Sequence, residues 1–338
     1  MKFLITGGLG FIGSSFIRLV HGEPQHEIVN LDKESYASMP ESLCEIINSE
    51  RYYFVKLNIH EYELLYKEIK AFKPDVILHF AAESHVDNSI DRPRDFLDSN
   101  VIGTFNILEC IKELKDDLPE NFRYIHVSTD EVFGSLDLKE NSFVEGSTYR
   151  PNSPYSATKA SSDLLVRAWR KTYKLPLIVT NCSNNYGPWQ HPEKLIPTII
   201  YNAISNQKIP IYGEGINIRD WLHVDDHVRA LLAISEKTLT FNRYNIGANQ
   251  EMSNLDLANM ICSLLDLKLK RKNSFKDLIT LVEDRPGHDF RYSINAERIK
   301  EDLEFNPKYA LKEGINETVD WYIDQKEWLV SKITSSRG

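Results

Sequence analysis

The chain has 338 residues, of which 42% are hydrophobic and 26% charged, which is typical of a folded globular protein and argues against intrinsic disorder. Its formal charge of −9 argues against nonspecific binding to nucleic acid or to an anionic membrane, because attraction to phosphate requires a basic face. No run approaches the ~18 apolar residues of a membrane span, and the four cysteines form no CxxC pattern. We therefore expect a cytoplasmic protein with no metal site, no disulfide framework and no membrane segment.

Short apolar segments alternate with longer amphipathic segments through the first half of the chain. This alternation predicts a doubly wound parallel sheet of the Rossmann type. Apolar residues at three- and four-residue spacing predict two long helices, over residues 96–114 and 155–173. The predicted strands cover residues 2–6, 27–31, 52–57, 76–80, 124–128 and 177–181.

The second half of the chain has a looser pattern, in which several prolines interrupt a segment rich in aromatic and polar residues. We expect a smaller, interleaved C-terminal substrate lobe there, because a helix near 225–235 and a strand near 244–246 should return to the main sheet. The expected division gives residues 1–181, with return segments at about 214–247, to the dinucleotide-binding domain. Residues 182–213 and 248–338 then form the lobe.

A glycine-rich turn follows the first predicted strand. Gly7, Gly10 and Gly13 form a GxxGxxG pattern at the start of a helix, where missing side chains let the backbone approach a pyrophosphate. Asp32 ends the second strand, where a carboxylate accepts both ribose hydroxyls of NAD and repels a 2′-phosphate. Lys33 weakens that preference slightly, because a lysine attracts a 2′-phosphate. The pattern predicts an NAD site, the alternative being glycines that only shape a tight turn.

Tyr155 and Lys159 lie one helical turn apart, after Ser153 as N-cap and Pro154 as first helical residue. A lysine ammonium and a nicotinamide cation both stabilise a nearby phenolate, which makes the tyrosine a base near neutral pH. A Tyr and a Lys at this spacing also occur by chance in many helices. The NAD pattern upstream favours the catalytic interpretation.

Ser128, Thr129, Asp130 and Glu131 close the fifth predicted strand. Oxidising a sugar hydroxyl to a ketone acidifies the neighbouring proton, so one carboxylate removes that proton while one carboxylic acid protonates the departing hydroxyl. We expect the two acidic residues to lie on an extended segment, where neighbouring side chains diverge, and their pKa values to differ. This pair predicts a dehydratase that borrows a redox cofactor. The alternative is two solvated acids at the end of a strand.

Two further functions compete with dehydration. A nucleotide-sugar 4-epimerase would use the same NAD, Tyr155 and Lys159 but would not need Asp130 and Glu131. A noncatalytic NAD-sensing module is a possible fate of this fold, but such a protein typically loses the Tyr or the Lys.

Several sequence blocks in order resemble the nucleotide-sugar 4,6-dehydratases, which belong to the extended branch of the short-chain dehydrogenase/reductase superfamily. The matching blocks are AAESHVD (81–87), STDEVFG (128–134), SPYSATKASSD (153–163), NCSNNYGP (181–188), PEKLIP (192–197), IRDWLHVDDH (218–227) and DRPGHD (284–289). The resemblance implies that Tyr155 deprotonates the C4 hydroxyl, with Thr129 bonded to the same oxygen. It also implies that Glu131 removes the C5 proton and Asp130 protonates the C6 hydroxyl, while NAD carries hydride from C4 to C6.

The same resemblance assigns the binding residues. Those implied for NAD are Gly7, Gly10, Phe11, Ile12, Gly13, Asp32, Lys33, Asn58, Ile59, Ala81, Ala82, Ser99, Tyr155, Lys159 and Asn185. Those implied for the nucleotide sugar are Ser84, Thr129, Asn184, Lys194, Leu195, Pro210, Tyr212, Arg219, Asn254, Arg285 and His288.

The resemblance is strongest to family members that act on dTDP-glucose, and it implies a homodimer formed through the two long helices. Asn88 stands where an arginine is frequent in those enzymes, whereas relatives acting on UDP-glucose also have Asn. UDP-glucose is therefore the alternative substrate. Asn58 replaces the usual aspartate beside the adenine, and Ser38 and Met39 replace a Gly-Asn pair near the adenosine pocket.

Overall fold

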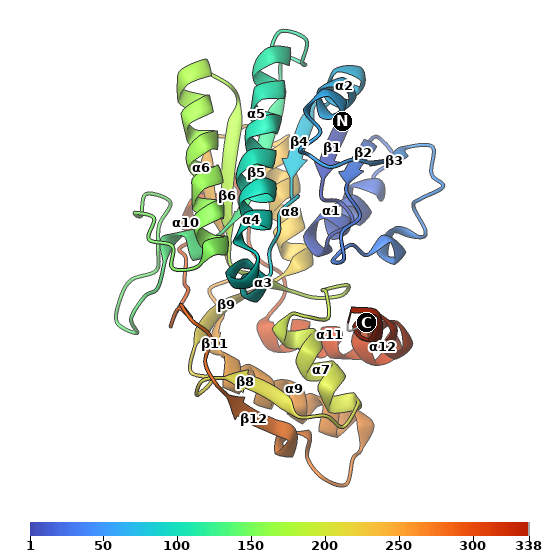
Figure 1. Ribbon diagram of the computed structural model, residues 1–338, viewed down its shortest axis with the longest axis vertical. Helices are drawn as coiled ribbons and strands as arrows, with labels where there is room; N and C mark the ends of the chain where they lie inside the picture. Colours follow the sequence, from blue (N-terminus) through green and yellow to red (C-terminus); the bar gives the residue numbers. More distant parts are fainter. Residues whose placement is uncertain (337–338) are drawn as a thin grey trace.

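The computed structural model describes residues 1–336. Seven parallel strands form the central sheet in the order β10-β6-β5-β4-β1-β2-β3 (Figure 1). The predicted fold class is confirmed. The strands are β1 (Lys2–Thr6), β2 (Glu27–Asp32), β3 (Tyr52–Lys56), β4 (Val76–His79), β5 (Arg123–Thr129), β6 (Leu177–Cys182) and β10 (Arg243–Ile246).

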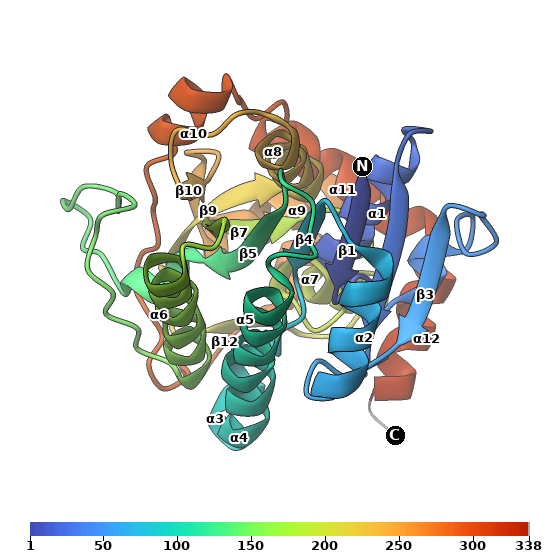
Figure 2. The ribbon, with the colours of Figure 1, turned by 90° about the horizontal axis from the view of Figure 1, so that it is seen from above.

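Helices cover both faces of this sheet, as Figure 2 shows from above. Neighbouring residues of β1 point to opposite faces, so Phe3 packs in one apolar cluster and Leu4 in another. The first cluster receives side chains from α1 (Phe11–His21), α8 (Val224–Glu236) and α10 (Glu297–Leu303). The second receives them from α2 (Tyr62–Phe72), α5 (Gly103–Leu114) and α6 (Pro154–Tyr173).

The helix predicted over 96–114 starts earlier and is not uniform. α3 (Val86–Asp91) precedes α4 (Pro93–Phe96), in which proline occupies the first position, and a π-helical turn (Leu97–Ile102) joins α4 to α5. π-turns are rare and occur often at functional sites. This one buries Ser99 and Asn100 beside the carboxyl end of the sheet.

A second group of elements lies beyond the carboxyl ends of the sheet strands (Figure 1). It contains a three-stranded sheet of β7 (Asn184–Tyr186), β9 (Ile218–His223) and β11 (Glu251–Ser253), and a two-stranded sheet of β8 (Ile209–Tyr212) and β12 (Ile279–Val282). Its helices are α7 (Leu195–Ile204), α9 (Asn254–Leu269), α11 (Leu311–Asp324) and α12 (Lys326–Ser336). These helices share an apolar cluster, which includes Ile199, Ile261 and Ile315.

The return of the chain to the main sheet is visible in β10, which pairs with β6. The division into domains by residue number stays a prediction. Short 3-10 helices cover Pro40–Leu43, Asp130–Phe133 and Phe275–Leu278. Within residues 1–336 no helix is both long and apolar enough to cross a membrane.

Candidate active site

A cavity of about 300 Å³ lies at the carboxyl end of the parallel sheet, where doubly wound folds bind their ligands. The five predicted catalytic residues line this cavity, together with all the predicted NAD-binding residues. Ser84, Asn184 and Lys194 of the predicted substrate residues line it as well. Leu195, Pro210, Tyr212, Arg219, Asn254, Arg285 and His288 are not among the lining residues.

The glycine turn depends on missing side chains at two positions. Gly7 has a positive φ of 73°, and a Cβ there would lie 2.5 Å from the backbone nitrogen of Ala81. A Cβ on Gly13 would lie 2.4 Å from the carbonyl oxygen of Gly7. The turn therefore holds β1, β4 and the start of α1 in close contact, and it leaves the N-terminus of α1 facing the cavity.

Asp32 is almost fully buried at the end of β2. Its carboxylate accepts hydrogen bonds from the backbone nitrogens of Leu9 (3.0 Å) and Glu34 (2.8 Å) and from the Ser38 hydroxyl (3.2 Å). Burial raises the pKa of Asp32, whereas these hydrogen bonds oppose the rise. Ser38, one of the departures from the family pattern, therefore helps to fix this carboxylate.

Lys33 is held by a residue that the sequence analysis did not single out. Its ammonium lies 2.6 Å from the carboxylate of Glu83. Asn100 in turn holds the backbone of Glu83, because its side chain accepts from the Glu83 nitrogen at 2.9 Å and donates to the Glu83 oxygen at 3.1 Å. A paired Lys33 is less available to a 2′-phosphate.

The side-chain amides of Asn58 and Asn185 are engaged within the protein. Asn58 Oδ1 accepts from the His60 nitrogen at 3.1 Å. Asn185 Oδ1 lies 2.9 Å from His227 Nδ1, and its Nδ2 donates to the Ser183 oxygen at 2.9 Å. These bonds fix the orientation of both side chains at the cavity wall.

The predicted helix cap at Ser153 is confirmed: Ser153 and Ser156 form a reciprocal capping box, and Pro154 follows the cap. Lys159 then donates a hydrogen bond to the Val127 oxygen at 2.8 Å. Burial raises the pKa of Tyr155 well above its ordinary value, and the nearby Glu131 carboxylate raises it further. In this site the phenol is neutral, and only added positive charge beside it makes it a base at neutral pH.

The expectation that Asp130 and Glu131 lie on an extended segment is wrong. They begin a 3-10 helix, because the Thr129 side chain caps it by accepting from the Glu131 nitrogen at 3.2 Å. Gly134, with φ of 90°, ends this helix. The two carboxyl groups therefore diverge through the helical turn.

The electrostatic environments of the two acids differ. Burial raises the pKa of Asp130 well above its ordinary value, and the charges of Glu131 and Asp220 raise it further. Burial also raises the pKa of Glu131, but Arg285, Arg219 and Lys194 oppose that rise. Burial thus favours the protonated form of Asp130, while Glu131 beside it faces three cations.

The three cations beside Glu131 come from different parts of the chain. Arg219 is buried, with its guanidinium 4.2 Å from the centre of the Tyr292 ring and bonded to the Asp289 oxygen at 2.9 Å. Lys194 donates to the Ser84 oxygen at 2.9 Å. Arg285 Nη1 lies 3.5 Å from an oxygen of Asp87. An acidic protein thus has a local basic cluster beside Asp130 and Glu131.

The other predicted substrate residues occupy the neighbouring elements. Tyr212 donates to Asp87 at 3.3 Å and shares β8 with Pro210, while His288 Nδ1 lies 2.7 Å from Asp284. Leu195 and Asn254 begin α7 and α9. Asn184 Oδ1 is buried without a hydrogen-bond partner among the described residues.

Asp87 is, after Glu83, a second residue that the sequence analysis missed, because it lies within AAESHVD but had no assigned role. It contacts both Arg285 and Tyr212. Its position in that block was the available signal.

The fold and the site together define a dinucleotide-binding enzyme scaffold with a Tyr–Lys pair and two adjacent acids, a buried Asp130 and a half-buried Glu131. A family model described as GDP-mannose 4,6 dehydratase matches residues 4–318. A dTDP-glucose 4,6-dehydratase of Escherichia coli is 47% identical over 97% of this chain and 95% of its own length.

Solved structures agree with these matches. The dTDP-glucose 4,6-dehydratase of Bacillus anthracis, in complex with NAD, has a TM-score of 0.88 and 43% identity over 98% of this chain and 99% of its own. The enzyme of the same name from Streptomyces venezuelae, with NAD bound, has a TM-score of 0.88 and 40% identity over 97% and 98% of the two chains. The chain belongs to the nucleotide-sugar 4,6-dehydratase family.

Proposed function

We propose that this protein catalyses the NAD-dependent dehydration of dTDP-glucose to dTDP-4-keto-6-deoxyglucose and water. One observation carries the proposal: Asp130 and Glu131, whose pKa values are both raised by burial, line the same cavity as Thr129, Tyr155 and Lys159. An epimerase would not need that acid pair. The relatives named above support dTDP-glucose as the substrate.

The residues at the carboxyl end of the sheet fit NAD. The glycine turn leaves no room for a Cβ at Gly7 or Gly13, as expected for a backbone that cradles a pyrophosphate. Asp32 offers a fixed carboxylate to a ribose, and the pairing of Lys33 with Glu83 disfavours a 2′-phosphate. When bound, NAD supplies oxidation at C4 and returns the same electrons to C6.

The side chains then move protons in sequence. Tyr155 takes the proton of the C4 hydroxyl, and Thr129 bonds to the same oxygen. Lys159 and the nicotinamide ring supply the positive charge that the buried phenol lacks. Glu131 removes the C5 proton once C4 is a ketone, and it returns a proton to C5 when the hydride is added at C6. Burial raises the pKa of Asp130 and so favours its protonated form, which donates its proton to the departing C6 hydroxyl.

The basic cluster would hold the diphosphate of the substrate. Arg219 and Arg285 carry the planar donor groups that suit phosphate oxygens, and Lys194 adds a third charge. Arg285 forms an ion pair with Asp87 in the structure, so on substrate binding Arg285 would exchange this contact for one to a phosphate oxygen. Tyr212 and Pro210 would lie near the nucleotide base of the substrate.

Incubation with dTDP-, UDP-, GDP- and CDP-glucose tests the reaction and the nucleotide together. We expect dTDP-glucose to turn over fastest and to give the alkali-stable absorbance of a 4-keto sugar. Fastest turnover of UDP-glucose would assign the alternative substrate, which Asn88 favours. Production of dTDP-galactose would contradict the dehydratase function.

We also propose a cytoplasmic homodimer, formed through α5 and α6, which lie side by side (Figures 1 and 2). The exposed apolar side chains Leu97, Ile102, Phe105 and Leu164 support this interface. Sedimentation of the protein and of a Leu164→Glu variant tests it. The wild type should sediment as a dimer and the variant as a monomer, whereas a monomeric wild type would contradict the interface.

A further inference from the structure

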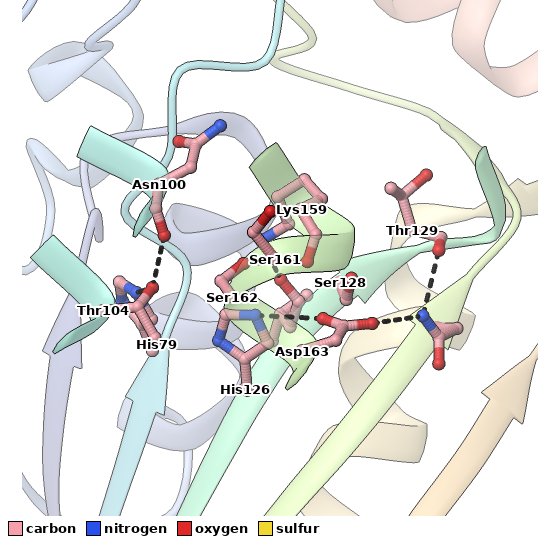
Figure 3. A network of polar contacts seen from close by, with 12 residues as sticks. His79, Asn100, Thr104, His126, Ser128, Thr129, Lys159, Ser161, Ser162 and Asp163 are labelled. Carbon is pink, nitrogen blue, oxygen red and sulfur yellow. Dashed lines mark hydrogen bonds and ion pairs between the residues drawn. The ribbon is translucent and has the colours of Figure 1, made fainter. Parts of the chain in front are cut away.

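A buried carboxylate lies one helical turn beyond Lys159 on α6. Asp163 is 2% exposed and follows Tyr155 and Lys159 on the same helix face, at four-residue spacing. Figure 3 shows Asp163 between His126 of β5 and the neighbouring strand, β6. The reaction steps proposed above do not use this residue.

Hydrogen-bond donors surround the Oδ2 atom of Asp163. Its Oδ2 accepts hydrogen bonds from Tyr149 Oη at 2.5 Å and Asn181 Nδ2 at 3.1 Å, and the Arg243 guanidinium lies 3.4 Å away. Its Oδ1 lies 3.2 Å from His126 Nε2. Donors from three sides compensate the loss of hydration.

The same network reaches the catalytic end of β5. Asn181 Nδ2 bonds not only to Asp163 but also to the Thr129 oxygen, at 3.0 Å. Lys159 bonds to the Val127 oxygen of the same strand. The backbone immediately before Asp130 is thus tied to α6 through both Lys159 and Asp163.

The charge balance around Lys159 gives Asp163 a second effect. Lys159 is faced by Asp163 on its own helix, by His126 on β5, by His79 on β4 and by Cys182 on β6. Burial lowers the pKa of His79 well below its ordinary value and that of His126 to about 4, so both are neutral at pH 7. Burial raises the pKa of Cys182 and so keeps its thiol neutral as well.

Building on the dehydratase function proposed above, we propose that Asp163 is a positioning residue for the oxidation step. Its carboxylate keeps the buried Lys159 charged and, through Asn181, fixes the end of β5 that carries Thr129. Burial alone lowers the pKa of Lys159, and the charge of Asp163 opposes that change. Without a protonated Lys159, Tyr155 loses one of the two positive charges that stabilise its phenolate.

The direct test is a nitrogen-15 NMR titration of the Lys159 side chain in the NAD-loaded protein, assigned by comparison with Lys159→Arg. Asp163→Asn keeps the shape, because its oxygen still accepts from Tyr149 and Asn181 while its NH2 group faces His126. We expect the Lys159 pKa to fall by about one unit or more in this variant. An unchanged Lys159 pKa would overturn the proposal.

Two controls separate charge from folding. Tyr149→Phe removes one hydrogen bond but keeps the carboxylate, so Lys159 should titrate as in the wild type; a fall as large as in Asp163→Asn would assign the effect to packing and overturn the proposal. If Asp163→Asn does not fold, titration of Lys159 in the wild-type protein still tests the proposal. Lys159 should stay protonated through neutral pH, and titration below neutrality would contradict the proposal.

Turnover of dTDP-glucose gives a second readout. In Asp163→Asn the alkaline limb of the pH profile, where Lys159 loses its proton, should move to a pH about one unit lower. At pH values above that limb, the turnover rate of the variant should therefore be about tenfold lower than that of the wild type. A uniform loss at every pH would indicate a structural role only and overturn the proposal. The titration needs no sugar, so a wild type that fails to turn over dTDP-glucose refutes the proposed function and leaves the titration result standing.

Discussion

The cofactor side and the substrate side of the cavity are built in different ways. The cofactor side comes from consecutive strand–turn–helix units of one parallel sheet, in which Gly7 directly follows β1 and Asp32 ends β2. The substrate side is assembled from distant segments, such as Asp87 with Arg285, which are 198 residues apart. Local sequence therefore determines most of the cofactor side, except for contacts such as Lys33 with Glu83, whereas tertiary packing determines the substrate side. Mutations on the two sides, and at the acids between them, should have effects of different kinds.

The largest effect on turnover is expected at Tyr155, the proposed general base. Tyr155→Phe removes the group that takes the C4 proton, and we expect kcat to fall about 1000-fold, within the range of general-base catalysis. Tyr173→Phe, at the exposed end of the same helix, is the matched control and should keep wild-type activity. Steady-state turnover of dTDP-glucose measures both, and a Tyr155→Phe enzyme with more than a tenth of wild-type kcat would contradict the assigned role.

The next effect separates activity from stability. Asp130→Asn cannot donate a proton to the C6 hydroxyl, so we expect turnover to fall about 100-fold. Burial raises the pKa of Asp130 in the folded state, so this residue favours folding only below its unfolded-state pKa, near 4. That contribution is lost as the pH rises towards the folded-state pKa.

Asp130→Asn should therefore melt at a higher temperature than the wild type at neutral pH, and the difference should shrink as the pH falls towards 4. Calorimetry across this pH range measures it. A variant that is less stable than the wild type at neutral pH would show that the Asp130 carboxyl is not held protonated by burial.

A smaller effect is expected on the substrate side. Arg285→Ala removes a charged donor from the basic cluster, so KM for dTDP-glucose should rise about 10- to 100-fold, as for a lost charged hydrogen bond, with kcat changed less. Arg92→Ala, an exposed arginine paired with Asp95, is the control. Equal losses in kcat and kcat/KM would place Arg285 at the reacting carbons and not at the diphosphate.

The smallest effect is expected on the preference for NAD over NADP, when the Lys33–Glu83 pair is broken. Glu83→Gln releases Lys33 from a partly exposed ion pair, so the preference for NAD over NADP should fall by no more than about fivefold. Asp32 maintains most of that preference. Glu34→Gln releases the exposed Lys56 and should change nothing. Cofactor dissociation constants measure both variants, and a stronger NAD preference in Glu83→Gln would contradict the role given to this pair.

The same contrast explains what the sequence could predict. The six strands of the first half and the cap at Ser153 follow from local periodicity and turn chemistry, and the structure confirms them. The extended conformation expected at Asp130 was wrong, because a side-chain cap from Thr129 outweighs the strand pattern over a few residues.

Contacts across the fold could not be predicted from local patterns. The pairing of Lys33 with Glu83 and that of Asp87 with Arg285 depend on which loops meet at the end of the sheet. The assigned roles of the site residues remain predictions. The positions of the substrate residues came from resemblance to a family and not from spacing.

The central claim is that the electrons removed at C4 return to C6 of the same sugar. Turnover of dTDP-glucose carrying deuterium at C4 tests this most directly, with the product methyl group analysed by mass spectrometry or NMR. The account predicts that the deuterium appears in the new methyl group at C6. A product whose methyl group carries no deuterium would contradict it.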